Sequence, residues 1–385
     1  MSFLGQRSSR KLFIAAVSAL TILIAGCGSS STGDSSSNAS SSGSGAGGAQ
    51  VSAAKADMAA YAGKASAFPV GTPLTKRVPA GSTLAYLQCA APTCALAGKA
   101  VAGAAQALGL NYHPVQSGSS STDVTAAMNS IIALNPKIVI IPGLNPGPFC
   151  TQLKQLTSMG VGVGTFGVVG AQACGVEASM NGETSQKLGG RLMADWVVAN
   201  KGAEAKVALY VSPELSFSAN VQTGFTTQMK ELCASCSVRI VKIPLASYAS
   251  TAPSMMVSDL QRNADTNTMV FDNQEGAIGL PSALRTAGLS DRVKEIGWGP
   301  EPANLSDIKS GQITAGVGVD VPTMIWMAVD AAIRIATGQP LAGEETQGVP
   351  PTQVLQQSDI TFDPTNGFAP YPDFAQRFIK LWGAP

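Results

Sequence analysis

The hydrophobic pattern between residues 138 and 166 contains one complete repeat of the predicted fold. Residues 138–141 are branched and apolar without polar alternation, which is typical of a strand buried on both faces of a parallel sheet. A turn cluster at 145–148 is followed by apolar residues at helical spacing over 149–156, and a second apolar run spans 161–166. This order of elements predicts a parallel crossover unit. Its ligand edge would lie at the carboxyl ends of the strands, near Asn145 and Phe166.

The same alternation continues along most of the chain. Strands are predicted at 83–88, 206–211, 238–243, 268–272, 293–298 and 312–319. Helices are predicted at 51–65, 94–108, 123–134, 220–232, 253–263, 275–287, 302–309 and 323–337, with another opening at Asn181. About 330 residues follow the predicted tether, which is more than a domain with a single hydrophobic core usually contains. We therefore expect two α/β lobes, each with a doubly wound parallel sheet.

The amino terminus has the pattern of an export signal. Basic residues precede an apolar run at 12–26, which is shorter than the roughly twenty residues of a membrane-spanning helix. The end of this run, Leu-Ile-Ala-Gly before Cys27, resembles the lipobox of bacterial lipoproteins. That resemblance implies cleavage before Cys27 and a lipid on its sulfur, which would hold the protein at the outer face of the cell membrane. The alternative is an ordinary secretory peptide with a chance cysteine. Residues 28–50 are almost wholly Ser, Gly and Ala, which predicts a flexible tether.

Composition and motifs argue against several classes of function. The net charge is +1 and charged residues make up 13% of the chain, so no basic face for nucleic acid is predicted. With one histidine, His113, there is no zinc-protease motif, and the folded part has no G-x-S-x-G elbow. A G-x-G-x-x-G match at 162–167 lies inside an apolar strand, unlike a dinucleotide loop. We therefore expect a monomeric binding protein without enzymatic activity, cofactor or metal.

Six cysteines follow Cys27, and an exported chain meets oxidising conditions. Six cysteines permit fifteen pairings. Proximity in sequence favours Cys89 with Cys94, Cys150 with Cys174, and Cys233 with Cys236. A redox role for Cys233-Ala-Ser-Cys236 is the alternative, but the motif follows a helix end, where no helix amino terminus lowers a thiol pKa.

From about residue 83 to 338 the chain resembles the type I periplasmic binding proteins, in particular the sugar-binding subfamily that includes ribose-binding protein. Residues 271–279 match the family phrase F-x-N-D-E-x-A-x-G, and 296–299 match V-G-F-D. Residues 310–315 match D-G-x-x-T-A, and Gly224-Phe225 match the end of R-x-x-G-F. The resemblance implies two lobes joined by a three-segment hinge and a solute held between them. It also implies delivery of that solute to the permease and ATPase subunits of an ABC importer. The alternative is a ligand-sensing lipoprotein that signals to a membrane receptor.

This resemblance also sets the predicted domain boundaries. We assign residues 1–26 to the signal peptide, 27–50 to the tether, and 51–79 to a helix and connector. The first lobe is predicted at 80–176 with about 319–342, and the second at 177–318 with about 343–385.

Several positions depart from the sugar binders. The family's carboxylates, arginines and hinge glutamine, which hold sugar hydroxyls, are replaced here by Gln274, Gly299, Val221, Gly167, Val168 and Val319. Asn273 is retained, and Tyr248 falls where the family often stacks an aromatic ring on a sugar. We therefore expect a small neutral polar solute, sugar-like or less hydroxylated. The carboxyl ends of the strands select the candidate ligand-binding residues Gln88, Thr93, Asn145, Phe166, Phe217, Asn220, Tyr248, Asn273, Gln274, Trp298 and Glu301.

Overall fold

The computed structural model describes residues 44–63, 67–89, 92–118, 120–213, 215–248 and 250–384. Residues 42–385 belong to one structural unit. The predicted signal peptide, Cys27 and most of the predicted tether lie outside the described residues. So do residues 64–66, at the end of the predicted helix 51–65 and the start of the predicted connector.

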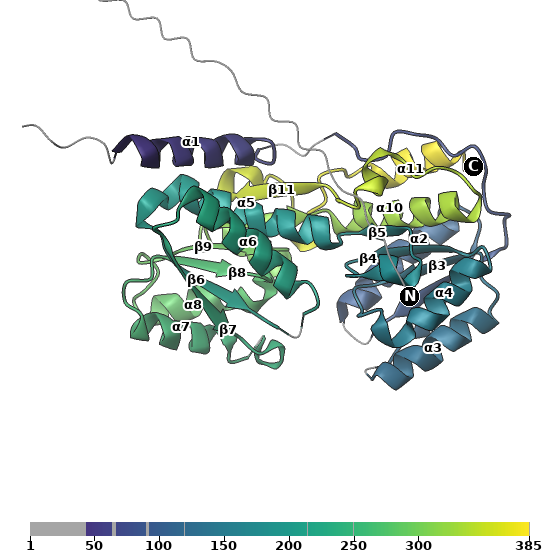
Figure 1. Cartoon of the computed structure of the whole chain (residues 1–385), viewed down its shortest axis with the longest axis horizontal. Helices are drawn as coiled ribbons and strands as arrows, with labels where there is room; N and C mark the ends of the chain where they lie inside the picture. Colours follow the sequence, from purple (N-terminus) through teal and green to yellow (C-terminus); the bar gives the residue numbers. More distant parts are fainter. Residues whose placement is uncertain are drawn as a thin grey trace, which may run out of the picture. The chain divides into compact units, whose positions relative to one another are not determined.

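The first lobe is built on a parallel sheet with strand order β2-β1-β3-β4-β5 (Figure 1). Its strands are β1 Thr83–Gln88, β2 Asn111–Gln116, β3 Ile138–Ile141, β4 Gly162–Phe166 and β5 Ala178–Met180. The helices between them are α2 Pro92–Ala107, α3 Ser121–Ala133 and α4 Cys150–Ser158. All four residues of β3 are buried, as the unbroken apolar run predicts.

The second lobe is built on a six-stranded sheet with strand order β11-β10-β9-β8-β6-β7. Only β11 runs antiparallel to its neighbour. The strands are β6 Lys206–Val211, β7 Ser237–Lys242, β8 Thr268–Phe271, β9 Lys294–Trp298, β10 Ala315–Val319 and β11 Thr352–Gln356. The helices are α5 Glu183–Lys201, α6 Ser218–Leu232, α7 Ala252–Arg262, α8 Leu280–Thr286 and α9 Pro302–Lys309. The predicted fold class, two doubly wound α/β lobes, is confirmed.

Helix α10, Val321–Ala336, follows β10 but packs on the first sheet, and two glycines of β4 make this possible. A Cβ atom at Gly162 would lie 1.9 Å from the carbonyl oxygen of Ala332, and one at Gly164 would lie 2.2 Å from that of Ala328. The glycines of the G-x-G motif therefore let a helix backbone approach the sheet. This is a packing role rather than a dinucleotide site.

The described residues show five passages of the chain between the lobes. Three join β5 to α5, β10 to α10, and α10 to β11, as the family resemblance implies. A fourth lies in the tail, between Phe368 in the second-lobe core and helix α11, Phe374–Trp382. That helix packs on α10, and the Trp382 indole donates to Asp330 Oδ1 at 2.6 Å. The fifth is the amino-terminal connector, whose helix α1, Ser44–Ala59, packs on α5 (Figure 1).

Three sequence expectations need correction. Helix α1 begins at Ser44 inside the predicted tether and ends at Ala59, before the predicted end at residue 65. The predicted helix at 275–287 is broken, because Gly279 adopts a left-handed φ of 85° and Pro281 starts a new helix. The lobe boundaries also shift: β5 extends the first lobe to Met180, and α11 returns the tail to that lobe instead of leaving all of 343–385 in the second.

The three predicted disulfides are confirmed: Cys89–Cys94, Cys150–Cys174 and Cys233–Cys236. The first two lie in the first lobe and the third lies at the end of α6. Within the described residues, no helix combines the length and the apolar character that crossing a membrane requires.

Candidate functional site

The candidate site of the second lobe lies where its parallel strands end. Phe217 and Ser218 follow β6, Tyr248 follows β7, Asn273 follows β8, and Glu301 follows β9. Because β7, β6, β8 and β9 are successive neighbours in the sheet, these loops form one continuous edge. We call this set of loops the second-lobe edge.

A buried polar network fixes the second-lobe edge. The backbone N–H of Ser212 donates to Asp272 Oδ2 at 2.9 Å, and the Ser218 hydroxyl donates to the same oxygen. The Ser212 hydroxyl donates to the Ile243 carbonyl at 2.7 Å and lies 2.7 Å from the Tyr248 hydroxyl. Asp272 is 1% exposed, so its role is to hold the loops after β6, β7 and β8 together. Sequence analysis missed this network, because serines after strands look like ordinary loop residues.

Tyr248 lies at the surface of this network with its ring half-buried. Its ring rests on Gly276, where a Cβ atom would come within 2.8 Å of the tyrosine Cζ. A glycine at this position therefore allows the ring to lie flat against the backbone of the loop after β8. The tyrosine position is set from two sides, by the Ser212 hydroxyl and by this contact.

Three further polar side chains, Asn273, Glu275 and Glu301, are half-buried in the loops that follow β8 and β9. Asn273 accepts from the Glu275 N–H at 3.2 Å and donates to Glu275 Oε2 at 3.4 Å. Glu301 caps α9, Pro302–Lys309, through a capping box with Asn304. Burial, followed by the nearby Glu275 carboxylate, raises the pKa of the Glu301 carboxyl. Carboxylate oxygens and an amide that can both donate and accept therefore lie at the same edge.

Two predicted ligand contacts are instead part of the core. Gln274 is fully buried, and its Nε2 donates to the Ala315 carbonyl at 2.9 Å, in space left by Gly297 and Gly316. Trp298 is 5% exposed, packs against Gly189 of α5, and meets the Phe217 ring edge-on at 4.9 Å between centroids. We therefore remove Gln274 and Trp298 from the candidate site.

Asn220 and Phe217 are half-buried at the start of α6. Asn220 Nδ2 donates to Gln186 Oε1 of α5 at 2.8 Å, so this amide links two helices. Phe217 packs on Trp298 with part of its ring still accessible. Of the two, Phe217 is the better placed to contact a solute.

The first-lobe edge offers fewer free polar groups. Asn145 is exposed, and its Oδ1 accepts from the Gly147 N–H at 3.0 Å in a local turn. Phe166 is buried at the end of β4, and Gln88 is half-buried with its amide turned towards Gly98 of α2. The side chain of Thr93 lies outside the described part of the chain. The described residues of this edge therefore offer few accessible polar side chains.

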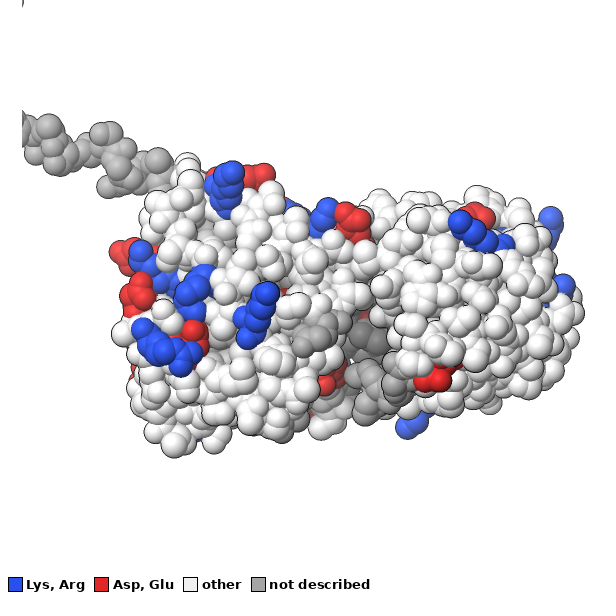
Figure 2. Space-filling model, turned by 60° about the horizontal axis from the view of Figure 1, so that its bottom comes forward, with Lys and Arg blue, Asp and Glu red and all other residues white. Residues whose placement is uncertain are grey.

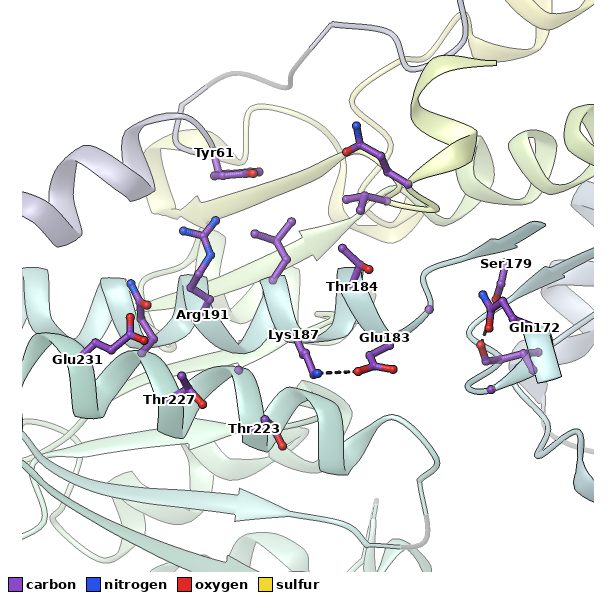
Figure 3. A pocket seen from close by; sticks show the side chains of 18 residues that line it. Tyr61, Gln172, Ser179, Glu183, Thr184, Lys187, Arg191, Thr223, Thr227 and Glu231 are labelled. Carbon is purple, nitrogen blue, oxygen red and sulfur yellow. Dashed lines mark hydrogen bonds and ion pairs between the residues drawn. The ribbon is translucent and has the colours of Figure 1, made fainter. Parts of the chain in front are cut away.

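An open groove of about 890 Å³ lies elsewhere, beside the first crossing. Figure 3 shows its wall formed by side chains of α5 and α6, with Tyr61 on one side and Gln172 and Ser179 on another. Its two charged pairs are internal: Lys187 contacts Glu183 at 2.5 Å, and Arg191 pairs with Asp57. None of the predicted ligand-binding residues lines this groove. We therefore keep the strand edges, and not the groove, as the candidate solute site.

The conserved pattern of the periplasmic binding protein domain matches residues 91–340. The chain belongs to the periplasmic binding protein family. Family members are binding proteins that act outside the cytoplasm. A comparison with curated proteins gives no match.

Solved structures share the fold of this periplasmic binding protein. The glucose-galactose binding protein GanP of Geobacillus stearothermophilus is 17% identical, with a TM-score of 0.62, and the match covers 74% of this chain and 100% of that one. The Caulobacter myo-inositol binding protein is 21% identical, with a TM-score of 0.61 and coverages of 74% and 97%. The 5-methylthioribose transporter solute binding protein of Thermotoga lettingae is 16% identical, with a TM-score of 0.63 and coverages of 80% and 99%.

A buried acid at the second crossing of this periplasmic binding protein was not identified from the sequence. Asp320 caps α10: its Oδ1 accepts from the Thr323 N–H at 3.0 Å and its Oδ2 accepts from the Thr323 hydroxyl at 2.6 Å. Burial raises the pKa of Asp320 to about 6, despite these two hydrogen bonds. The Asp-x-Pro-Thr order is a helix-start signal that sequence analysis alone can detect.

Charged side chains of this binding protein are unevenly distributed. Figure 2 shows a mostly uncharged face, with the Lys and Arg side chains gathered mainly on the half that contains the second lobe.

Among the described residues, no group of His, Cys, Asp and Glu side chains has the arrangement of a metal site.

Proposed function

We propose that this protein binds a small neutral polar solute between its two lobes and delivers it to the permease and ATPase subunits of an ABC importer. The observation that carries the proposal is the second-lobe edge, where Asn273 and Glu301 are half-buried and so is Tyr248, whose hydroxyl lies 2.7 Å from Ser212 of the buried network. Half-buried polar groups at the carboxyl ends of parallel strands are the usual setting of a ligand site in doubly wound folds.

The chemistry of this edge supports a solute with hydrogen-bond donors. Glu301 and Glu275 offer carboxylate oxygens, and charge-assisted bonds from hydroxyl or amide groups to such oxygens are strong. Asn273 can donate and accept, and the Tyr248 ring offers a flat apolar face. A hydroxylated or amide-bearing molecule with one flat or apolar side satisfies all of these groups. Among the similar solved structures are a glucose-galactose binding protein, a myo-inositol binding protein bound to myo-inositol, and a transporter solute binding protein in complex with 5-methylthioribose.

A thermal-shift screen tests the proposal. The soluble protein would be heated with sugars, polyols, nucleosides, amino acids and small acids in turn. A solute at one hundred times its Kd stabilises the folded state by about 2.7 kcal/mol, which raises the melting temperature. We expect a neutral polar compound to give this shift. A response only to ionic compounds, or to none of these classes, would contradict the proposal.

We also propose that a lipid on Cys27 holds the protein at the outer face of the membrane, because Cys27 ends a lipobox-like sequence and precedes a Ser- and Gly-rich tether. Cys27→Ala should move the protein from membrane to soluble fractions. An unchanged distribution after fractionation would show that Cys27 is not the anchor.

A further inference from the structure

The third crossing, which runs from α10 to β11, carries a buried acid that meets ionisable side chains of α10. The crossing contains a short helix, η6, Gly343–Thr346. Glu345 comes from η6, and Asp330 and Arg334 come from α10. None of these three residues is more than 1% exposed. We call them the crossing cluster.

The crossing cluster joins four segments of the chain. Arg334 Nε donates to Asp330 Oδ2 at 2.5 Å and lies 3.4 Å from Glu345 Oε2. Arg334 Nη2 donates to the Thr72 carbonyl at 2.5 Å, and the Trp382 indole donates to Asp330 Oδ1 at 2.6 Å. The third crossing, α10, α11 and the amino-terminal connector therefore meet at one guanidinium group and two carboxyl groups.

The charges of the crossing cluster do not balance if both carboxyl groups are ionised. Arginine keeps its charge in proteins, so Arg334 supplies one fixed positive charge. Two carboxylates beside it would leave one uncompensated negative charge in a site closed to water, which is strongly unfavourable. One bound proton removes that charge.

The described side chains around the crossing cluster do not supply a second cation. Strands β3, β4 and β5, which pack on α10, contain no ionisable residue. Glu344 of η6 is another acid, and its side chain lies outside the described part of the chain. The basic residues of α2, α11 and the connector around α10 are all exposed: Lys76, Arg77, Lys99, Arg377 and Lys380.

The hydrogen bonds favour Glu345 as the acid that holds the proton. Both oxygens of Asp330 accept from donors, an arrangement that stabilises an ionised carboxylate. Glu345 Oε2 accepts from the Ala342 N–H at 2.9 Å, whereas Glu345 Oε1 is buried without a hydrogen-bond partner. The Asp330 carboxyl lies within hydrogen-bonding reach of the Glu345 carboxyl. Burial, followed by this neighbouring carboxylate, raises the pKa of Glu345.

We infer that Glu345 keeps its proton in the folded protein at neutral pH and donates to Asp330, so that a neutral carboxyl fastens the third crossing to α10. Loss of this proton at higher pH places two carboxylates side by side and weakens the attachment of η6. The third crossing is one of the segments about which two lobes can rotate, so the proton makes this segment sensitive to pH. The inference does not depend on the solute.

Infrared difference spectroscopy of the folded protein at pH 7 tests for the proton. Glu345→Gln replaces the protonated carboxyl by an amide of similar size that can still donate to Asp330. The wild-type spectrum minus that of Glu345→Gln should contain the carbonyl band of a protonated carboxyl. Glu177→Gln, at an exposed glutamate just before β5, is the matched control and should give no such band. Absence of the band with Glu345→Gln, in a protein that melts cooperatively, would overturn the inference.

Denaturant unfolding at several pH values detects the same proton by its linkage to folding. The folded state binds the Glu345 proton more tightly than the unfolded state does. Its stabilisation is therefore full below the ordinary glutamate pKa and is lost as pH rises towards the raised pKa of the folded state. Between pH 6 and 8 the folding constant of the wild type, relative to Glu345→Gln, should fall about tenfold per pH unit. Parallel pH profiles would overturn the inference.

Hydrogen exchange tests whether the protonated carboxyl fastens the crossing. Glu345→Ala removes the hydrogen bond to Asp330 without adding a charge. At pH 7 the amides of residues 342–348 should exchange at least tenfold faster in Glu345→Ala than in Glu345→Gln. The turn at 288–291 in the second lobe is the internal control and should exchange equally in both variants. Equal exchange at 342–348 would overturn the fastening role.

Discussion

The two lobes share one architecture but build their facing edges differently. The first-lobe edge is held by two disulfides, Cys89–Cys94 and Cys150–Cys174, and by backbone turns such as that of Asn145. The second-lobe edge is held by a buried carboxylate, Asp272, with side-chain hydroxyls around it. The same topology can thus be fixed covalently or by hydrogen bonds. Among the described residues, only the second-lobe edge has several polar side chains half-buried at the surface.

Carboxyl groups with raised pKa values follow the same division. They occur in the second lobe and at the crossings, as with Glu295, Glu301 and Asp320. Burial is the first cause in each case. Of the three, Glu301 lies at the second-lobe edge, whereas Glu295 lies near the start of β9 and Asp320 caps α10.

The largest expected effect concerns the covalent support of the first lobe. Replacing Cys150 and Cys174 together by Ser opens a loop of sequence separation 24 and should lower the free energy of unfolding by roughly 3 to 4 kcal/mol. Replacing Cys233 and Cys236, which have a sequence separation of 3, should cost roughly 2 kcal/mol on the same loop argument. Denaturant unfolding measures both. Equal losses of unfolding free energy would show that loop length does not determine how much the Cys150–Cys174 disulfide stabilises the protein.

Asp272→Ala removes the corresponding support of the second lobe. It leaves the buried Ser212 N–H and Ser218 hydroxyl without their acceptor, at a cost of about 3 kcal/mol. Asn145→Ala in the first lobe is the control; this exposed change should cost no more than about 0.5 kcal/mol. If Asp272→Ala is as mild as Asn145→Ala, the network does not hold the edge.

One buried carboxyl of the second lobe, Glu295, should contribute to the pH dependence of stability. Burial raises the pKa of Glu295 to about 7 from 4.5, although the Thr314 hydroxyl donates to it at 2.8 Å. The folded state binds the Glu295 proton more tightly than the unfolded state does. Protonation of Glu295 therefore contributes its full stabilisation below about pH 4.5, and this stabilisation is lost as pH rises through 7. Between pH 5 and 7.5 the wild type should lose roughly 2 kcal/mol more than Glu295→Gln. Parallel pH profiles for the two proteins would contradict this assignment.

The smallest expected effects are on solute affinity. Tyr248→Ala and Asn273→Ala should each weaken binding of a screened solute by about 1 to 2 kcal/mol, through lost contact and unpaired polar groups. The melting temperature of the empty protein should change little. Calorimetry checks both values. If Asn145→Ala weakened binding more than either variant, recognition would belong to the first lobe.

Sequence patterns located most strands, including β3, β4, β8 and β10, in which every residue is buried. They missed β2, β5 and β11 for physical reasons. β2 is an edge strand with no fully buried residue and a proline at position 114, and β5 has only three residues. β11 pairs antiparallel after a long connection, so it lacks the strand-helix alternation that marked the others.

The sequence was sufficient to predict which edge of the sheet holds the candidate site. It was not sufficient to predict which side chains at that edge are accessible. Tyr248, Asn273 and Glu301 lie at the predicted edge with part of their surface accessible. Gln274 looked equivalent to Asn273 in the sequence, but glycines on two neighbouring strands, Gly297 and Gly316, leave space that its side chain fills. Such space depends on strands distant in sequence, which a local pattern does not contain.

Small-angle scattering of the wild-type protein tests the central claim most directly, which is that the two lobes close around a solute. The curve would be recorded with and without a saturating amount of the compound that most stabilises the protein in the thermal screen. Closure predicts a smaller radius of gyration in the bound state. Identical curves, with calorimetry confirming that the compound is bound, would contradict the claim.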